Sequence, residues 1–105
     1  MKISNIFENI PQNLKEELIE NILVDKNFKV ERIISEAHSS PIDFWYNQPT
    51  NEFIYLVSGS AGIMFEDRSV RTLKPGDYFV IEAGKKHRVE WTDTESKTIW
   101  LTIHY

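Results

Sequence analysis

Apolar and polar residues alternate with a period of two through the second half of the chain. From position 44 onward, short runs rich in β-branched and aromatic residues lie between Gly, Pro, Asn and Asp residues that favour turns. This pattern predicts strands, because neighbouring strand residues point to opposite faces. The predicted strands are 44–48, 52–58, 61–66, 69–73, 78–82, 87–92 and 97–104. Many short strands with no helix between them indicate an all-β antiparallel sandwich or barrel.

The N-terminal third is less regular. Residues 1–16 predict an arm that apolar side chains at positions 3, 6, 7 and 10 could pin to the body. The segment 16–24 fits one face of a helix or one side of a strand. We favour a hairpin that joins it to a strand at 28–35, because Asp25-Lys26-Asn27 is a turn signal. A short helix is the alternative.

Strand parity places ionisable residues together at one end of the predicted barrel. Alternate residues share a face, so three inward faces can be read from the strands. These faces are Glu52, Ile54 and Leu56; His87, Val89 and Trp91; and Trp100, Thr102 and His104. Glu52 and His87 each begin a strand whose later positions on that face are apolar. This is the arrangement expected where a polar site opens above a packed floor.

Composition and charge narrow the function classes. With 105 residues, of which 41% are hydrophobic, the chain predicts a single domain over 1–105. A formal net charge of −4 argues against nucleic-acid binding, which leaves a basic footprint. The absence of cysteine excludes disulfides and thiolate metal sites. No apolar run has the length of a signal peptide or of a membrane span, so we expect no membrane partner and a cytoplasmic location.

Two motifs stand at the predicted polar end. The first is Glu52, six residues and Gly59; the second runs from Gly76 through Gly84 and two further residues to His87. Their combined spacing resembles the cupin superfamily, over roughly residues 28–104. The resemblance implies a single antiparallel cupin-type β-barrel, jelly-roll-like, preceded by the N-terminal arm.

The chain departs from the family's pattern at two positions, one within the second motif and one just after it. Glu82 replaces a proline that is usual in the family, and Trp91 stands where asparagine is frequent. The segment 60–75 between the motifs has the length and the Lys-Pro-Gly-Asp ending typical of cupins. The closest likeness is to small single-domain cupins.

The resemblance also implies a metal site, and here the chain matches the family only in part. Metal-binding cupins hold a divalent ion with a His-x-His pair, the glutamate of the first motif and the histidine of the second. Glu52 and His87 match the last two, and the histidine pair is missing. The corresponding positions are either Trp45 and Asn47 or Tyr46 and Gln48. The set implied for Fe, Mn, Ni or Zn is therefore Glu52 and His87, completed by Asn47 or His104.

A small molecule in the barrel interior is the ligand that we expect. Glu52 and His87 are its candidate polar or catalytic partners. The candidate ligand contacts are Tyr46, Asn47, Gln48, Trp91 and Trp100. The aromatic residues among them also fit a core or a dimer interface, since aromatic side chains dominate packing wherever they lie.

Three function hypotheses follow. The first is a binding module for a small molecule with a weak or degenerate metal site. The second is a divalent-metal-dependent enzyme, a dioxygenase, isomerase or lyase, that uses Glu52 and His87. The third is a barrel whose motif spacing only maintains turns.

A homodimer is expected on two grounds. Small cupins commonly pair, which the resemblance implies. In addition, apolar residues at positions 33, 34, 99, 101 and 103 would leave apolar strand surface that a partner sheet could cover.

Overall fold

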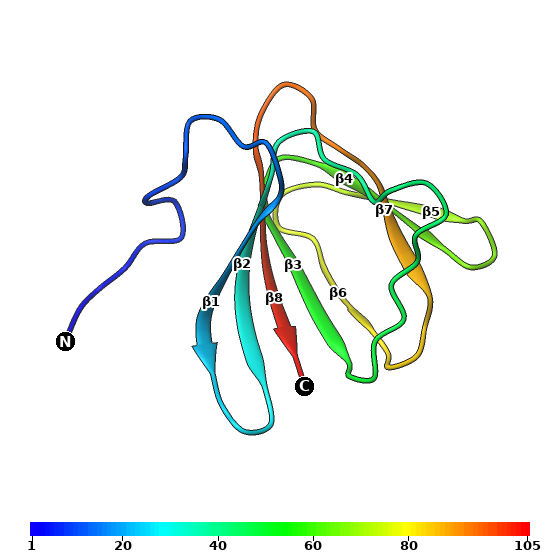
Figure 1. Ribbon diagram of the computed structural model, residues 1–105, viewed down its shortest axis with the longest axis horizontal. Helices are drawn as coiled ribbons and strands as arrows, with labels where there is room; N and C mark the ends of the chain where they lie inside the picture. Colours follow the sequence, from blue (N-terminus) through cyan, green and yellow to red (C-terminus); the bar gives the residue numbers. More distant parts are fainter.

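The chain folds into two antiparallel β-sheets packed face to face, and it contains no helix (Figure 1). The structure is a computed structural model that describes all of residues 1–105. The larger sheet has the strand order β1-β2-β8-β3-β6, and the smaller sheet has the order β5-β4-β7. The strands are β1 Leu18–Val24, β2 Lys29–Ser35, β3 Glu52–Ser58, β4 Ala61–Phe65, β5 Val70–Leu73, β6 Tyr78–Ile81, β7 His87–Thr92 and β8 Thr98–His104. The predicted all-β, jelly-roll-like class is confirmed, although no hydrogen-bonded ladder joins the two sheets.

The predicted N-terminal hairpin is present. Strand β1 pairs antiparallel with β2 from Leu18 opposite Ile34 to Val24 opposite Lys29, across the expected turn. The helical alternative for residues 16–24 is therefore wrong. Tertiary pairing decides between the two patterns, because β2 in turn bonds to β8 along its whole length.

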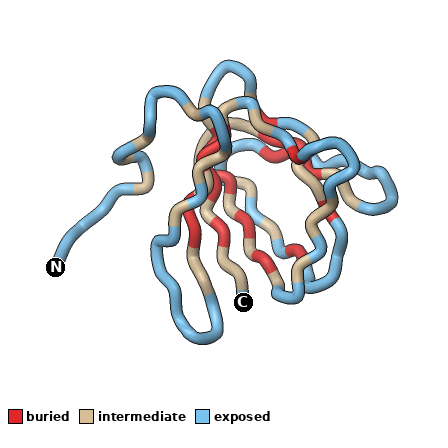
Figure 2. The backbone as a smooth tube through the Cα atoms, in the orientation of Figure 1, coloured by how far each residue is buried: buried red, intermediate tan, exposed pale blue.

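The core lies between the sheets, and Figure 2 shows buried segments along the length of their central strands. Leu56 of β3 and Ala61 of β4 are fully buried there. The whole cluster is Ile54, Leu56, Ala61, Ile63, Leu73, Ile81 and Trp100. These residues come from both sheets, so hydrophobic burial holds the two layers together.

The predicted strand at 44–48 is wrong. The connection from β2 to β3 makes a single β-bridge, between Tyr46 and His87 of β7. Pro41 and Pro49 bound this segment and lack the N–H groups that a ladder needs. Asp43 adds a positive φ of 65°, which interrupts an extended conformation. The connection thus covers the edge of β7 without becoming a regular strand.

Strand β7 contains a bulge that reverses the facing of its last residues. Ile63 of β4 lies opposite Val89, but the preceding Gly62 lies opposite Trp91, so Glu90 is an extra residue. A bulge shifts parity by one. As a result Trp91 points outward over Gly62, where any Cβ would collide with its indole ring. The expectation that Trp91 shares the inward face of His87 is wrong for this reason.

The N-terminal arm extends away from the body (Figure 1). Of the four apolar residues expected to pin it, Ile3 and Phe7 are exposed, whereas Ile6 and Ile10 are half-buried. The arm also has a polar contact with the sheet: the buried Arg32 guanidinium donates to the carbonyl oxygens of Ile6 and Glu8 at 2.9 and 2.7 Å. The protein has no helix with the length and apolarity that a membrane crossing requires.

Candidate functional site

The register of the larger sheet brings three ionisable residues side by side on its inner face. Lys29 of β2 lies directly opposite His104 of β8, and His104 lies directly opposite Glu52 of β3. The next inner row contains Glu31, Thr102 and Ile54 in the same strand order. Directly opposed residues on one face have Cβ atoms about 5 Å apart. The site is therefore built by strand pairing.

Two carboxylates share the His104 imidazole. Its Nε2 lies 2.9 Å from Oε1 of Glu31 and 3.4 Å from Oε2 of Glu52. Because both neighbours are acceptors, this nitrogen carries a proton and donates it, most directly to Glu31. Lys29 approaches the other Glu31 oxygen at 3.5 Å. The four side chains form one continuous chain of alternating acid and base.

His87 reaches the same carboxylate from the opposite sheet. Its Nε2 lies 3.5 Å from Oε1 of Glu52, and both side chains are more than nine-tenths buried. The other ring nitrogen, Nδ1, lies 3.0 Å from the Lys85 carbonyl oxygen and so donates to it. In the neutral ring this fixes Nε2 as a bare acceptor facing a carboxylate. The space between Nε2 and Glu52 thus calls for a donor, either a proton on the ring or a group of a ligand.

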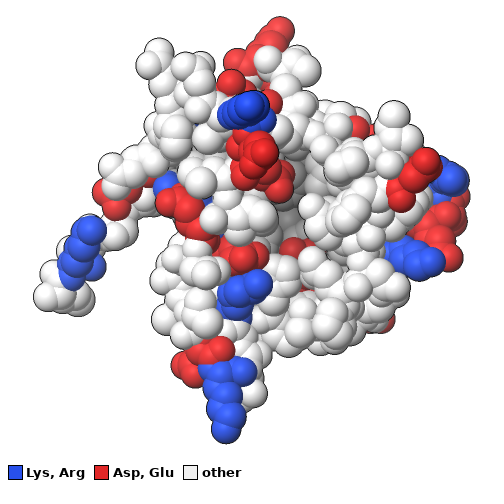
Figure 3. Space-filling view, viewed as in Figure 1, with Lys and Arg blue, Asp and Glu red and all other residues white.

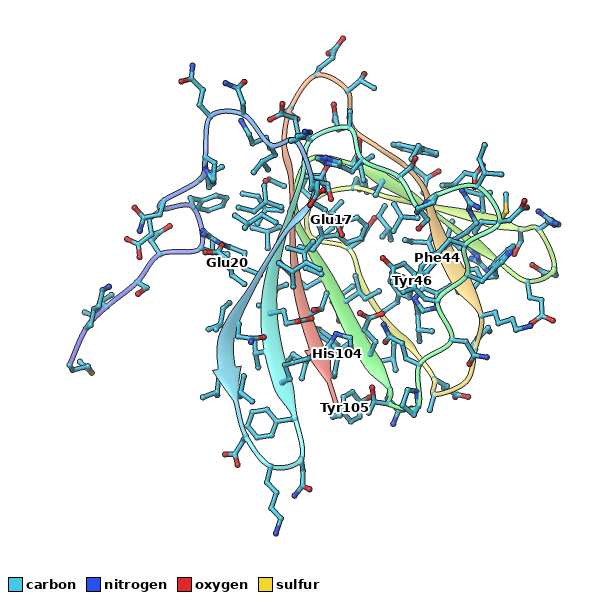
Figure 4. All side chains as sticks on the ribbon, viewed as in Figure 1. Glu17, Glu20, Phe44, Tyr46, His104 and Tyr105 are labelled. Carbon is cyan, nitrogen blue, oxygen red and sulfur yellow. The ribbon has the colours of Figure 1, made fainter.

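Tyr46 covers His87 from the β2–β3 connection. The backbones of the two residues exchange hydrogen bonds of 2.7 and 3.1 Å, and their rings stack with centroids 5.4 Å apart. Burial raises the pKa of the Tyr46 phenol above its ordinary value, and the carboxylates of Glu17 and Glu52 raise it further. Figure 4 shows Tyr46 and His104 on opposite sides of the space between the sheets. Negative charge is therefore concentrated near this phenol.

A cavity of about 250 Å³ lies among these groups. Its floor is apolar and includes Ile54, Ile63 and Trp100, which also belong to the core. Its wall is polar and consists of Glu17, Lys29, Glu31, Tyr46, Gln48, Glu52, His87, Thr102 and His104. This volume is somewhat below the usual range for drug-sized ligands, so it suits a smaller molecule.

Two buried polar atoms of the chain have neither a hydrogen-bond nor an ionic partner. They are Oε1 of Gln48 and Oγ1 of Thr102. Both residues line the cavity, and Thr102 is only 2% exposed. Leaving a buried polar group unpaired costs roughly 1–3 kcal/mol, so natural proteins rarely do so. Such atoms concentrated in one cavity point to a polar ligand.

A larger groove of about 810 Å³ lies on the outside, between β5 and β6. Arg71, Thr72 and Tyr78 among its lining residues are exposed. No buried polar atom without a partner lies in it. It is a seam between two unpaired sheet edges and lacks the converging polar groups of the inner cavity.

The structure places six of the eight predicted site residues around the cavity and two outside it. Those that line the cavity are Glu52, His87, His104, Tyr46, Gln48 and Trp100. Asn47 is exposed and Trp91 lies on the outer face, so neither reaches it. The bridge between Tyr46 and His87 decides the open question of register: Tyr46 and Gln48 point inward, and their neighbours Trp45 and Asn47 do not line the cavity.

Sequence reasoning missed the contribution of the N-terminal hairpin. Glu17, Lys29 and Glu31 all line the cavity. The signal for Lys29 and Glu31 was present, because they alternate with Val30 and share a face with Ile33. Glu17 precedes β1 and is held by a hydrogen bond from Ser35 Oγ of 2.8 Å, which no local pattern reveals.

The implied metal set does not fit this arrangement. No three of the His, Asp and Glu side chains are grouped so that they could hold one ion. The reason is visible at Glu52, whose two oxygens face different imidazoles, with His104 also committed to Glu31. Asn47, the third ligand considered, lies away from the cavity. His104 is thus held by the two carboxylates, which leaves Glu52 and His87 as two ligands where the implied set needs at least three.

The family model of the cupin domain matches residues 32–104. The chain belongs to the cupin superfamily. Among solved structures, a candidate mannose-6-phosphate isomerase from Ralstonia eutropha JMP134 is 42% identical to this cupin, with a TM-score of 0.94. The match covers 99% of this chain and 97% of that one. No curated protein matches the sequence.

More distant cupin-like structures share the fold alone. The polyketide cyclase RemF from Streptomyces resistomycificus is 20% identical, with a TM-score of 0.72 over 86% of this chain and 65% of its own. The EutQ protein of Clostridium difficile is 12% identical, with a TM-score of 0.70 over 85% and 67%. Their different names agree with the general rule that one scaffold serves many functions.

Proposed function

We propose that this cupin binds a small polar molecule in the cavity between its sheets, with Glu52 and His87 as the central polar contacts. The observation that carries the proposal is the cavity itself, on whose wall His87 Nε2 and Glu52 Oε1 face each other at 3.5 Å above an apolar floor. A hydroxyl or amine of a ligand would supply the donor that this pair lacks. The apolar floor of Ile54 and Ile63 would take the hydrocarbon part.

Plugging the mouth of the cavity tests this proposal. A library of small polar compounds is screened by protein-observed NMR against the wild type, against Gln48→Trp and against Asn47→Trp. Gln48 lines the cavity, whereas its neighbour Asn47 is exposed and does not, so the pair is a matched control on one segment. We expect compounds that bind the wild type and Asn47→Trp but not Gln48→Trp. Compounds that bind all three proteins equally would show that the cavity is not their site.

An enzyme is the second candidate, and the 42%-identical relative favours it. That protein is named as a candidate mannose-6-phosphate isomerase. An aldose–ketose isomerisation needs a base to remove a proton from carbon and an acid to return one. Glu52, held between two imidazoles, has the position for such proton transfer. A coupled assay that detects fructose 6-phosphate formed from mannose 6-phosphate tests it. Activity that is absent from Glu52→Gln would support it, and no activity above an uncatalysed control would exclude this reaction.

A homodimer and a cytoplasmic location remain predictions. The apolar residues that favour a dimer lie on the outer face of the larger sheet, where Ile103, Phe53 and Val80 form one row. Val80 is 48% exposed, while Ile34 and Ile99 are already buried within one chain. Ile33 faces the cavity and would not contribute, contrary to expectation. Size-exclusion chromatography with light scattering should give twice the mass of one chain; the mass of a monomer would contradict pairing.

A further inference from the structure

The charge of the cavity lining limits the chemistry of its ligand. Glu17, Glu31 and Glu52 face Lys29 as the only permanent cation, so the lining has a formal net charge of −2 when both imidazoles are neutral. The Lys29 side chain is 45% exposed, whereas Glu31 is 10% exposed at its side chain. Water therefore screens the cation more than the carboxylates. Figure 3 shows acidic atoms at the hollow in the middle of this face.

The aromatic rings of the wall are attractive to positive charge in the same sense. Tyr46 and Trp100 both line the cavity. Glu17 accepts only from Ser35 Oγ, whose own oxygen takes the indole N–H of Trp100 at 3.2 Å. The Trp100 N–H is thereby occupied, and the rest of its ring is available to the cavity. The wall consequently combines carboxylates with aromatic surface.

The negative charge and the aromatic surface favour one class of molecule. Resting on the proposed function, we propose that the cavity ligand is a small organic cation: a protonated amine that also carries hydroxyl groups. Its ammonium group would lie among Glu17, Glu52 and the Tyr46 and Trp100 rings, where carboxylates and aromatic rings both attract positive charge. Its hydroxyl groups would reach Gln48 and Thr102.

The same lining would repel an anionic ligand. A phosphate in this cavity would approach the three carboxylates with Lys29 as its only permanent counter-charge. Like charges in a partly buried site repel strongly, because little water screens them. The 42%-identical relative is named for a phosphorylated sugar, so the ligand expected for this chain differs from the one in that name. The lining predicts that the ligand of this chain is not phosphorylated.

Three compounds that differ only at the central carbon separate the possibilities: serinol, glycerol and β-glycerophosphate carry an ammonium, a hydroxyl and a phosphate there. Isothermal titration of the wild type, with EDTA present to remove metal ions, gives the three affinities. We expect serinol to bind at least about tenfold more tightly than glycerol, and β-glycerophosphate not to bind. Tighter binding of β-glycerophosphate, or equal affinity for all three, would overturn the cation proposal.

Two variants test whether a preference for serinol over glycerol arises from the cavity lining. Glu52→Gln should abolish the advantage of serinol over glycerol, because it removes a carboxylate without changing the shape of the side chain. Glu95→Gln, at an exposed carboxylate in the turn before β8, should leave both affinities unchanged. A serinol advantage that survives Glu52→Gln would place the cation elsewhere and overturn the proposal.

The failure of this inference is distinct from failure of the proposed function. If glycerol or β-glycerophosphate binds and Gln48→Trp blocks it, the cavity is a ligand site but not one for cations. If none of the three compounds binds at concentrations up to about 10 mM, the cation proposal is rejected. The compound screen on Gln48→Trp and Asn47→Trp then decides alone whether the cavity binds any small molecule.

Discussion

The two ends of the interior use the same strands for different purposes. Strand β3 contributes Leu56 to the closed end and Glu52 to the open end, and β8 contributes Thr98 and His104 in the same way. At the closed end apolar side chains fill the space, and polar groups are paired: Asp93, for example, accepts from Ser60 and from two backbone amides. At the open end, carboxylates and imidazoles surround a cavity, and polar atoms lack partners. The closed end is packed for stability, whereas the open end leaves polar groups unpaired at a cost in stability, which agrees with the proposed binding site.

The largest effect should come from the closed end. Leu56→Ala leaves a void at a fully buried position, which destabilises proteins by about 2–5 kcal/mol. Urea denaturation measures the loss. At temperatures where the variant is folded, its affinity for a cavity ligand should match the wild type. A stability change below about 1 kcal/mol would contradict the assignment of the core to this end.

Glu52→Gln should stabilise the fold, whereas Leu56→Ala destabilises it. It removes one of three carboxylates that lie close together, so we expect the free energy of unfolding to rise by about 1 kcal/mol at neutral pH. Denaturation in urea measures this gain, and ligand titration should show the accompanying loss of binding. If the variant instead loses about 3 kcal/mol or more, Glu52 is the structural partner of charged imidazoles. The comparison of the two ends would then fail.

Thr102→Val tests the contrast between unpaired polar groups at the open end and paired ones at the closed end. The two side chains have nearly the same shape, and the hydroxyl of Thr102 has no partner to lose. Stability should therefore change by less than about 1 kcal/mol, in the stabilising direction. Thr98→Val is the matched control at the closed end, because the Thr98 hydroxyl donates to the Ser60 carbonyl at 3.1 Å. The Thr98 variant should be the less stable of the two, and the reverse order would contradict the account.

The smallest effect is a pH dependence at the closed end. Hydrogen bonds from the Glu95 amide, the Ser60 hydroxyl and the Ser96 amide hold the pKa of Asp93 below its ordinary value of 3.8. The folded state thus favours the carboxylate, and its stabilising contribution is present above that value and lost as the pH falls through the lowered pKa. The stability gap between wild type and Asp93→Ala should shrink on acidification below about pH 4. A gap that is constant with pH would show that the charge of Asp93 makes no contribution.

Much of the open end could be predicted from strand parity. The alternation along β3 and β8 places Glu52 and His104 on the inner face, because both strands are regular where these residues lie. Trp91 was misplaced because the bulge at Glu90 reverses parity, and nothing in the local pattern marks that bulge. The choice between Tyr46 and its neighbours depended on a single long-range bridge. Glu17 lies outside any regular strand, so only tertiary structure reveals it.

Methyl-labelled NMR during a titration with serinol tests the central claim most directly, because isoleucines report on both faces of the larger sheet. Ile33 and Ile54 line the cavity together with Ile63, whereas Ile34 and Ile99 are buried on the other face. The account predicts saturable shifts of the first three methyl signals and none for the last two. Shifts at Ile34 and Ile99 without shifts at the three cavity isoleucines would contradict a serinol site at the open end, and no shift at any isoleucine would contradict the cation proposal.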